Sequence, residues 1–134
     1  MNILLDTHLM LWAMNDDPKL PDLARDFLLD GDNTIYYSTA SLWEITIKHI
    51  IHPDRMNFSG KELSEYAREA GFLPLDVQEK HVFQLETLKR EPEAPMHNDS
   101  FDRILIAQAK AENMLFLTAD ALLPYYNEKC IILV

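Results

Sequence analysis

Five short apolar runs, separated by longer segments of helical pattern, constrain the fold of this chain more than any other feature. Each run is almost continuously apolar and lacks the polar alternation of a sheet that has one face in water. Both faces of these strands are therefore expected to be buried, as in parallel sheets that helices cover on each side. The five predicted strands are Asn2–Leu5, Thr34–Tyr37, Phe72–Leu75, Met114–Leu117 and Ile131–Val134.

Apolar residues at helical spacing fill the gaps between the runs. Strands that alternate with helices imply right-handed crossovers. The sequence therefore predicts an α/β three-layer sandwich, with a central, mostly parallel sheet of about five strands flanked by helices. The 134 residues suit one domain over residues 1–134. Helices are expected after Pro21, after Ser38 or Thr39, up to Gly71, over Val77–Lys89 and from Asp99 or Ser100, with a long loop over Arg90–Asn98.

Charge and cysteine content limit the classes of function. The net charge of −10 argues against a general nucleic-acid coat protein, which needs a basic face, but not against an enzyme that reaches phosphates through metal ions. The single cysteine, Cys130, excludes an internal disulfide framework and fits a reducing cytoplasm. No apolar stretch approaches the roughly 20 residues that cross a bilayer, and no signal peptide is expected. A cytoplasmic protein without a membrane association is predicted.

Four acids fall where the predicted topology brings strand ends and helix starts together. Asp6 directly follows the first strand and Asp120 follows the fourth, in "LFLTAD". Glu44 lies early in the helix after the second strand, and Asp102 lies in the first turn of the helix that leads into the fourth. Ligands in such sheets gather beyond the carboxyl ends of the strands. The loop before Asp102 is long enough for that helix to begin at the same edge, so the topology allows all four acids to meet.

Each acid also has a purely structural explanation. Asp6 could cap a turn, Asp102 could follow an N-terminal cap at Asp99, and Asp120 could cap the segment "ALLPYY". Glu44 could face solvent, although its apolar neighbours Trp43 and Ile45 argue against full exposure. Four clustered carboxylates would repel each other by several kcal/mol without a cation. Oxygen ligands without a Cys/His cluster favour Mg²⁺ or Mn²⁺ over zinc.

The five histidines have no zinc-site spacing. His49 and His52 are expected at the surface, and His8 is close to Asp6 in sequence. His97 precedes the acids of the fifth helix and is the histidine of greatest interest.

The strings "LLDTH", "SLWEITIKH", "HNDSFDRILIAQA" and "LFLTAD" resemble PIN domains, specifically the VapC-like ribonuclease toxins of prokaryotic toxin–antitoxin pairs. The resemblance covers nearly the full chain in the family's order. It implies acidic site residues at Asp6, Glu44, Asp102 and Asp120, with Thr118 in support and Asp99 as a weaker candidate. Relatives commonly have proline where this chain has Ser100, and both residues suit a helix start.

The resemblance implies hydrolysis of RNA phosphodiester bonds by a water that Mg²⁺ or Mn²⁺ activates. It also implies a cognate antitoxin that lays a basic side chain into the acidic pocket, and a homodimer. The candidate apolar surfaces for dimerisation are on Leu9–Met14 and Trp43–Ile51, although most of these residues are expected in the core.

Two alternatives stay open. A phosphatase of the haloacid dehalogenase type uses Asp-x-Asp after its first strand, but His8 holds the second position here. A non-catalytic interaction domain could use the acids to bind a structural cation. A receiver-like domain of this kind needs paired acids and a late lysine that this chain does not place correctly.

Overall fold

Five parallel strands form one sheet in the order β3-β2-β1-β4-β5 in the computed structural model, which describes residues 1–134. The predicted α/β fold is confirmed, and the sheet is wholly parallel. Each predicted strand end is within one residue of the observed one. The strands are β1 (Asn2–Leu5), β2 (Thr34–Ser38), β3 (Leu73–Leu75), β4 (Leu115–Thr118) and β5 (Ile131–Leu133).

The first strand occupies the centre of the sheet. Ile3 pairs with Ile35 of β2 on one side and with Leu115 of β4 on the other. The side chains of β1 alternate between the two faces of the sheet, and Ile3, Leu4 and Leu5 are all buried. A central strand covered on both faces has no solvent-facing positions, which explains its unbroken apolar sequence.

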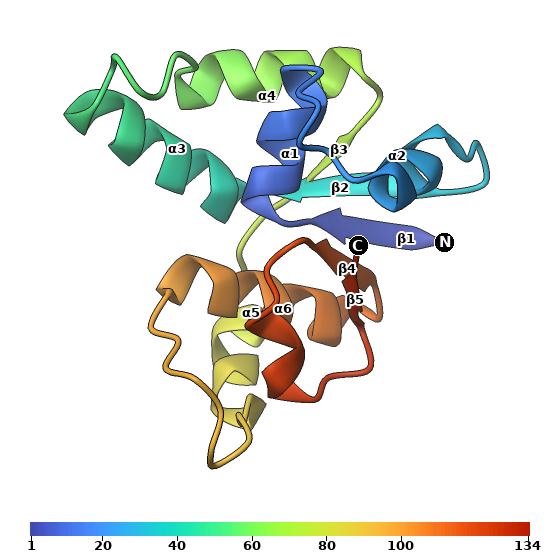
Figure 1. The fold of residues 1–134 in the computed structure, drawn as a ribbon, viewed down its shortest axis with the longest axis vertical. Helices are drawn as coiled ribbons and strands as arrows, with labels where there is room; N and C mark the ends of the chain where they lie inside the picture. The colour runs from blue at the N-terminus through green and yellow to red at the C-terminus, as the bar shows by residue number, and fades with distance from the viewer.

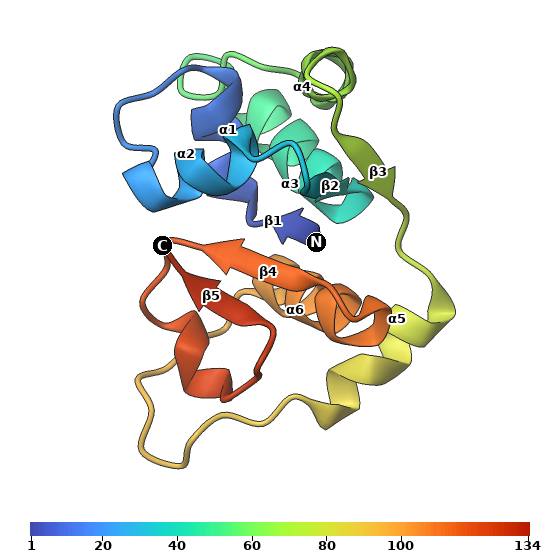
Figure 2. The same cartoon turned by 90° about the vertical axis from the view of Figure 1, so that its right-hand side faces the viewer.

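Helices cover both faces of the sheet, as Figure 2 shows. One layer contains α1 to α4, and the other contains α5 and α6. The core is correspondingly divided: Ile3 and Leu5 belong to a cluster with residues of the first layer, and Leu4 belongs to a cluster with residues of α6. The helices are α1 (Thr7–Met14), α2 (Asp22–Leu29), α3 (Thr39–Ile51), α4 (Gly60–Glu69), α5 (Glu79–Gln84) and α6 (Ser100–Glu112), with 3₁₀ turns η1 (Leu85–Thr87) and η2 (Leu123–Tyr126).

The predicted helix starts after Ser38 and Asp99 are confirmed by their capping bonds. The Ser38 hydroxyl accepts from the amide of Ala40, and the Asp99 carboxylate accepts from the first amides of α6. Gly71 has φ of 87°, the left-handed conformation expected just after a helix end. The helix predicted over Val77–Lys89 is shorter than expected. It stops at Gln84, and the tighter turn η1 follows, where the Thr87 hydroxyl donates to the Gln84 carbonyl.

Helix α1 was not predicted. It begins at Thr7, directly after β1, with Asp6 as its N-cap. Leu9, Met10 and Leu11 are all buried, so the helix presents no regular polar face to reveal its period. The expectation that most of Leu9–Met14 packs in the core is therefore confirmed for its first three residues.

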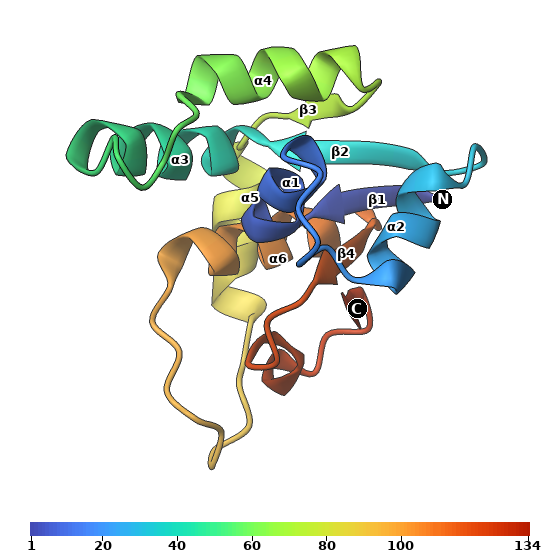
Figure 3. The ribbon, with the colours of Figure 1, turned by 45° about the horizontal axis from the view of Figure 1, so that its top comes forward.

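The long loop predicted over Arg90–Asn98 is confirmed and hangs below the sheet in Figure 1. It lets α6 start at the edge of the sheet where β1 and β2 end, and Figure 3 shows α1, α3 and α6 all beginning on that side. Helix α6 then runs back to β4 through Asn113, whose φ is 54°. No helix in the structure has the length and apolar composition needed to span a membrane.

Candidate active site

Asp6 links the end of β1 to the start of α1. Its side chain is only 2 % exposed, and both of its oxygens accept hydrogen bonds. Oδ1 accepts from the amide of His8 at 2.9 Å, and Oδ2 accepts from the hydroxyl of Thr118 at 2.6 Å. Burial raises the pKa of the Asp6 carboxyl, and the two hydrogen bonds oppose that rise. The carboxylate is held in one orientation at the carboxyl edge of the sheet.

Asp120 follows β4 and lies next to this carboxylate. The Thr118 hydroxyl that donates to Asp6 also accepts from the amide of Asp120 at 3.0 Å. The Oδ1 atom of Asp120 accepts from the amide of Leu122, so the capping explanation holds for this acid as it does for Asp6. Both acids nevertheless line one open pocket of about 250 Å³, together with His8, Trp12 and Ala119.

Asp102 completes a close group of side chains that could hold a metal ion. One ligand atom each from Asp102, Asp120 and His97 lies within 4.8 Å of the others. Burial first, and then the charges of other acids, raise the pKa of the Asp102 carboxyl to about 8. Those acids are, in decreasing order of effect, Asp6, Asp99, Glu44 and Asp120. All the acids singled out in the sequence therefore lie close enough to act on one carboxyl group.

Glu44 lies on α3 and is buried, with 5 % of its surface exposed. The expectation that it would not face solvent is confirmed. Lys48, one helical turn later, places its Nζ atom 2.7 Å from Oε2 of Glu44. Glu44 is not a member of the close group around Asp102 and Asp120, although its charge reaches Asp102.

Asp99 caps α6. Its Oδ1 atom accepts from the amides of Phe101 and Asp102 at 2.9 and 3.1 Å. This local role accounts for its position, and its side chain is exposed. Asp99 therefore contributes charge near Asp102, while its hydrogen bonds serve the helix start.

Two buried polar pairs fix the elements that carry the acids. The hydroxyls of Thr7 and Ser41 lie 2.7 Å apart and join α1 to α3. The Ser38 hydroxyl donates to Oε1 of Gln108 at 2.5 Å and joins the start of α3 to α6. These pairs were not singled out in the sequence, because each joins residues far apart in the chain.

The structure agrees with only part of what the sequence predicts for the histidines. His8 is exposed, and its Nδ1 atom lies 3.8 Å from Oδ1 of Asp6. His49 is half-buried and bonds the carbonyl of Met56, away from the acids. The side chain of His97 bonds Asp102 and Tyr126, and Tyr126 was not singled out in the sequence.

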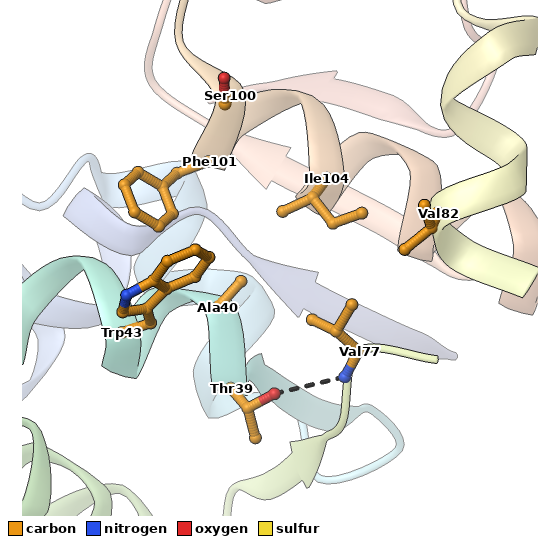
Figure 4. Close-up of a pocket in the computed structure, with 8 residues that line it drawn as sticks. All are labelled: Thr39, Ala40, Trp43, Val77, Val82, Ser100, Phe101 and Ile104. Atoms are coloured by element: carbon orange, nitrogen blue, oxygen red, sulfur yellow. Dashed lines mark hydrogen bonds between the residues drawn. The ribbon is translucent and has the colours of Figure 1, made fainter. Parts of the chain in front are cut away.

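An apolar pocket of about 470 Å³ lies between α3, α5 and α6 (Figure 4). The rings of Trp43 and Phe101 meet edge to face, with their centroids 5.2 Å apart. Each of these two residues directly precedes an acid, Glu44 or Asp102, in the chain. The remaining lining residues are Thr39, Ala40, Val77, Val82, Ser100 and Ile104.

The four acids Asp6, Glu44, Asp102 and Asp120 fit a hard divalent cation. Their carboxylate oxygens come from different elements and suit Mg²⁺ and Mn²⁺ better than softer metals. Burial together with mutual repulsion makes the ionised state of Asp102 costly, and a bound cation would remove that cost.

The model of the PIN domain family matches residues 3–128. The chain belongs to the PIN domain family. The resemblance seen in the sequence motifs is thereby confirmed. No curated protein matches this PIN domain.

Solved structures share the fold of this PIN domain. The structure of VapBC2 from Rickettsia felis, bound to a DNA fragment from its promoter, matches with a TM-score of 0.67 and 22 % identity. The match covers 100 % of this chain and 98 % of that one. FitAcB from Neisseria gonorrhoeae matches with a TM-score of 0.57 and 17 % identity, over 97 % of this chain and 96 % of that one.

Proposed function

We propose that this PIN domain is a ribonuclease that depends on Mg²⁺ or Mn²⁺ and hydrolyses RNA phosphodiester bonds. The observation that carries the proposal is the convergence of acids at the carboxyl edge of the sheet. Asp102 and Asp120 lie within ligand distance of each other, and the charges of Asp6 and Glu44 reach Asp102. Membership of the PIN family supports the same reading.

In this proposal the acids would hold the cation, and the cation would hold the scissile phosphate. A bound divalent ion lowers the pKa of an attacking water and stabilises charge on the leaving oxygen. Thr118 and the amide of His8 orient the Asp6 carboxylate. Lys48 partly neutralises Glu44, which lowers the repulsion among the four acids. No serine or cysteine nucleophile is needed.

A single assay separates this function from the two alternatives left open by the sequence. The purified chain is incubated with structured RNA, and separately with p-nitrophenyl phosphate, each in Mg²⁺ or in EDTA. We expect RNA cleavage in Mg²⁺ only and no hydrolysis of the small ester. Release of p-nitrophenol without RNA cleavage would instead identify a phosphatase, and inactivity toward both would identify a non-catalytic cation-binding domain.

We further propose that the enzyme is the toxin of a toxin–antitoxin pair. The similarity of its fold to VapBC2, a protein solved with promoter DNA, supports this. The cognate antitoxin would place an Arg or Lys side chain in the pocket, paired with Asp6 or Asp120. A net charge of −10 favours association with a basic segment. We also propose that residues 1–134 form one domain, and that the protein acts on its RNA substrate in the cytoplasm.

A homodimer is the second protein assembly that we propose. Trp43, Ile50 and Ile51 are exposed on α3, and Trp43 borders the apolar pocket. Large apolar side chains gathered on one helix are typical of a protein interface. Of the two candidate surfaces named from the sequence, Trp43–Ile51 is the one with exposed large apolar side chains, whereas the first residues of Leu9–Met14 are buried.

A further inference from the structure

His97 is buried beside the candidate metal site, and both nitrogens of its ring have partners. Its side chain is 5 % exposed. Nε2 lies 3.1 Å from Oδ2 of Asp102, and Nδ1 lies 2.8 Å from the hydroxyl of Tyr126. A neutral imidazole has one N–H donor and one acceptor nitrogen, so the partners decide which is which.

The partners favour one arrangement of protons. When a bound cation keeps Asp102 ionised, the Tyr126 hydroxyl can donate to Nδ1, and the Nε2–H of His97 then donates to the carboxylate of Asp102. Tyr126 is itself fixed: it is buried on η2, and its ring meets the His97 ring edge to face at 5.6 Å. The guanidinium of Arg90 lies over the Tyr126 ring, 5.5 Å from its centre.

The contact leaves one oxygen of Asp102 free. Oδ2 accepts from His97, whereas Oδ1 receives no hydrogen bond from the chain. Asp102 lies in the first turn of α6, and His97 lies in the loop before it, so the bond joins two separately placed backbone segments. It restricts rotation of the carboxylate and thus keeps Oδ1 available to a cation.

We propose that His97, held by Tyr126, is a positioning residue for the metal site and acts by orienting Asp102. The assignment rests on the proposed metal-dependent function. Because both ring nitrogens are engaged, His97 acts through Asp102 and is not itself a ligand. Its loss should therefore weaken Mg²⁺ and Mn²⁺ binding by the same factor. A directly bound imidazole would matter more for Mn²⁺, which accepts nitrogen ligands more readily than Mg²⁺ does.

Calorimetric titration of the purified chain with Mn²⁺, and then with Mg²⁺, tests this assignment. Removal of a partner that orients a ligand typically costs about tenfold or more in metal affinity. We expect a loss of about that size for both ions in His97→Ala. His97→Gln should recover most of it, because the amide can donate to Asp102 and accept from Tyr126. His49→Ala is the matched control, since His49 bonds the Met56 carbonyl away from the acids.

A spectroscopic measurement keeps the test decisive if His97→Ala does not fold. With the site saturated by Mg²⁺, so that Asp102 is ionised, the nitrogen chemical shifts of the wild-type imidazole should show that His97 carries its proton on Nε2. Tyr126→Phe removes only the hydroxyl and should disturb that assignment while the signals of His49 stay unchanged. A proton on Nδ1 in the wild type would contradict the proposed direction of the bonds.

The possible failures can be told apart. If the wild type binds neither ion, the metal site and this assignment both fall. If the wild type binds and folded His97→Ala binds equally well, only the role of His97 is refuted. If His97→Ala loses affinity for Mn²⁺ but keeps it for Mg²⁺, His97 is a direct ligand and the positioning role is wrong.

Discussion

The hydroxyl of Thr118 donates a hydrogen bond of 2.6 Å to the buried carboxylate of Asp6, across 112 positions of the sequence. The same hydroxyl accepts from the amide of Asp120. One side chain on β4 therefore fixes the first acid of the chain and the backbone of the last. A supporting role for Thr118 is what the family resemblance implied.

Replacement of Thr118 by Val should destabilise the protein. The substitution keeps the shape but leaves the carboxylate of Asp6 and the amide of Asp120 without that partner. We expect the free energy of unfolding to fall by about 2 kcal/mol, as for a hydrogen bond to a charged group. Urea denaturation measures it. Thr46→Val is the control, because Thr46 is exposed and bonds only a carbonyl of its own helix. Equal losses in the two variants would contradict the role of Thr118.

Mn²⁺ should raise the melting temperature of the wild-type protein. A ligand that binds only the native state stabilises it in proportion to the logarithm of its concentration above Kd. Differential scanning calorimetry with EDTA, and then with increasing Mn²⁺, measures the shift. Unchanged melting temperatures at saturating Mn²⁺ would remove the metal site from the proposal.

Asp6→Asn should lower RNA cleavage by at least about a hundredfold, because the metal supplies several kcal/mol to the transition state. Folding should survive, since the amide keeps the shape and repulsion among the acids falls. Cleavage rates in Mg²⁺ and a circular dichroism melt check both expectations. Asp54→Asn, which makes the same change at an exposed position, should cleave like the wild type. A parental rate in Asp6→Asn would exclude Asp6 from the mechanism.

Asp102→Asn should stabilise the metal-free protein, and increasingly so as the pH rises. The pKa of Asp102 is about 8 in the folded protein and 3.8 in the absence of the fold. The folded state therefore retains a proton that the unfolded state releases, so the wild type loses stability as the pH rises from about 4 toward 8. Melting temperatures in EDTA at several pH values measure this. The gap between variant and wild type should be smallest at the acidic end, and a constant gap would contradict the raised pKa.

Light scattering on the isolated chain at micromolar concentration should give twice the mass of one chain. Trp43→Glu puts a charge into the exposed apolar surface of α3 and should produce monomers without unfolding, because Trp43 is 64 % exposed. A strictly monomeric wild type would exclude a stable homodimer and leave the antitoxin as the proposed protein partner.

The sheet was predictable because burial on both faces makes its strands continuously apolar. Helices with one polar face, such as α6, were also predictable, and so were the caps at Ser38 and Asp99. Helix α1 was not, since its buried residues leave no amphipathic period and no turn separates it from β1. Local pattern could not reveal an element whose stability depends on packing against distant helices.

The acids of the site could be selected from sequence because each follows a strand or lies near a helix start. Their mutual arrangement could not. Lys48 bonds Glu44 from one helical turn away, a spacing that is readable in the sequence. Tyr126 bonds His97 over 29 positions, and local composition does not reveal that contact. Capping explains Asp99 fully, and it explains part of the placement of Asp6 and Asp120. A carboxylate that caps a helix or turn can therefore also be a candidate ligand for a cation.

The position of β1 at the centre of the sheet has a consequence for the newborn chain. Strand β1 leaves the ribosome before β4 and cannot pair with it until residues 115–118 have also been made. Asp120 follows β4 and is made later still. Contacts between such distant segments form late and slowly. A nascent chain therefore holds only part of the acidic pocket until Asp120 has been made, and the complete group of acids can form only after β4 has paired with β1.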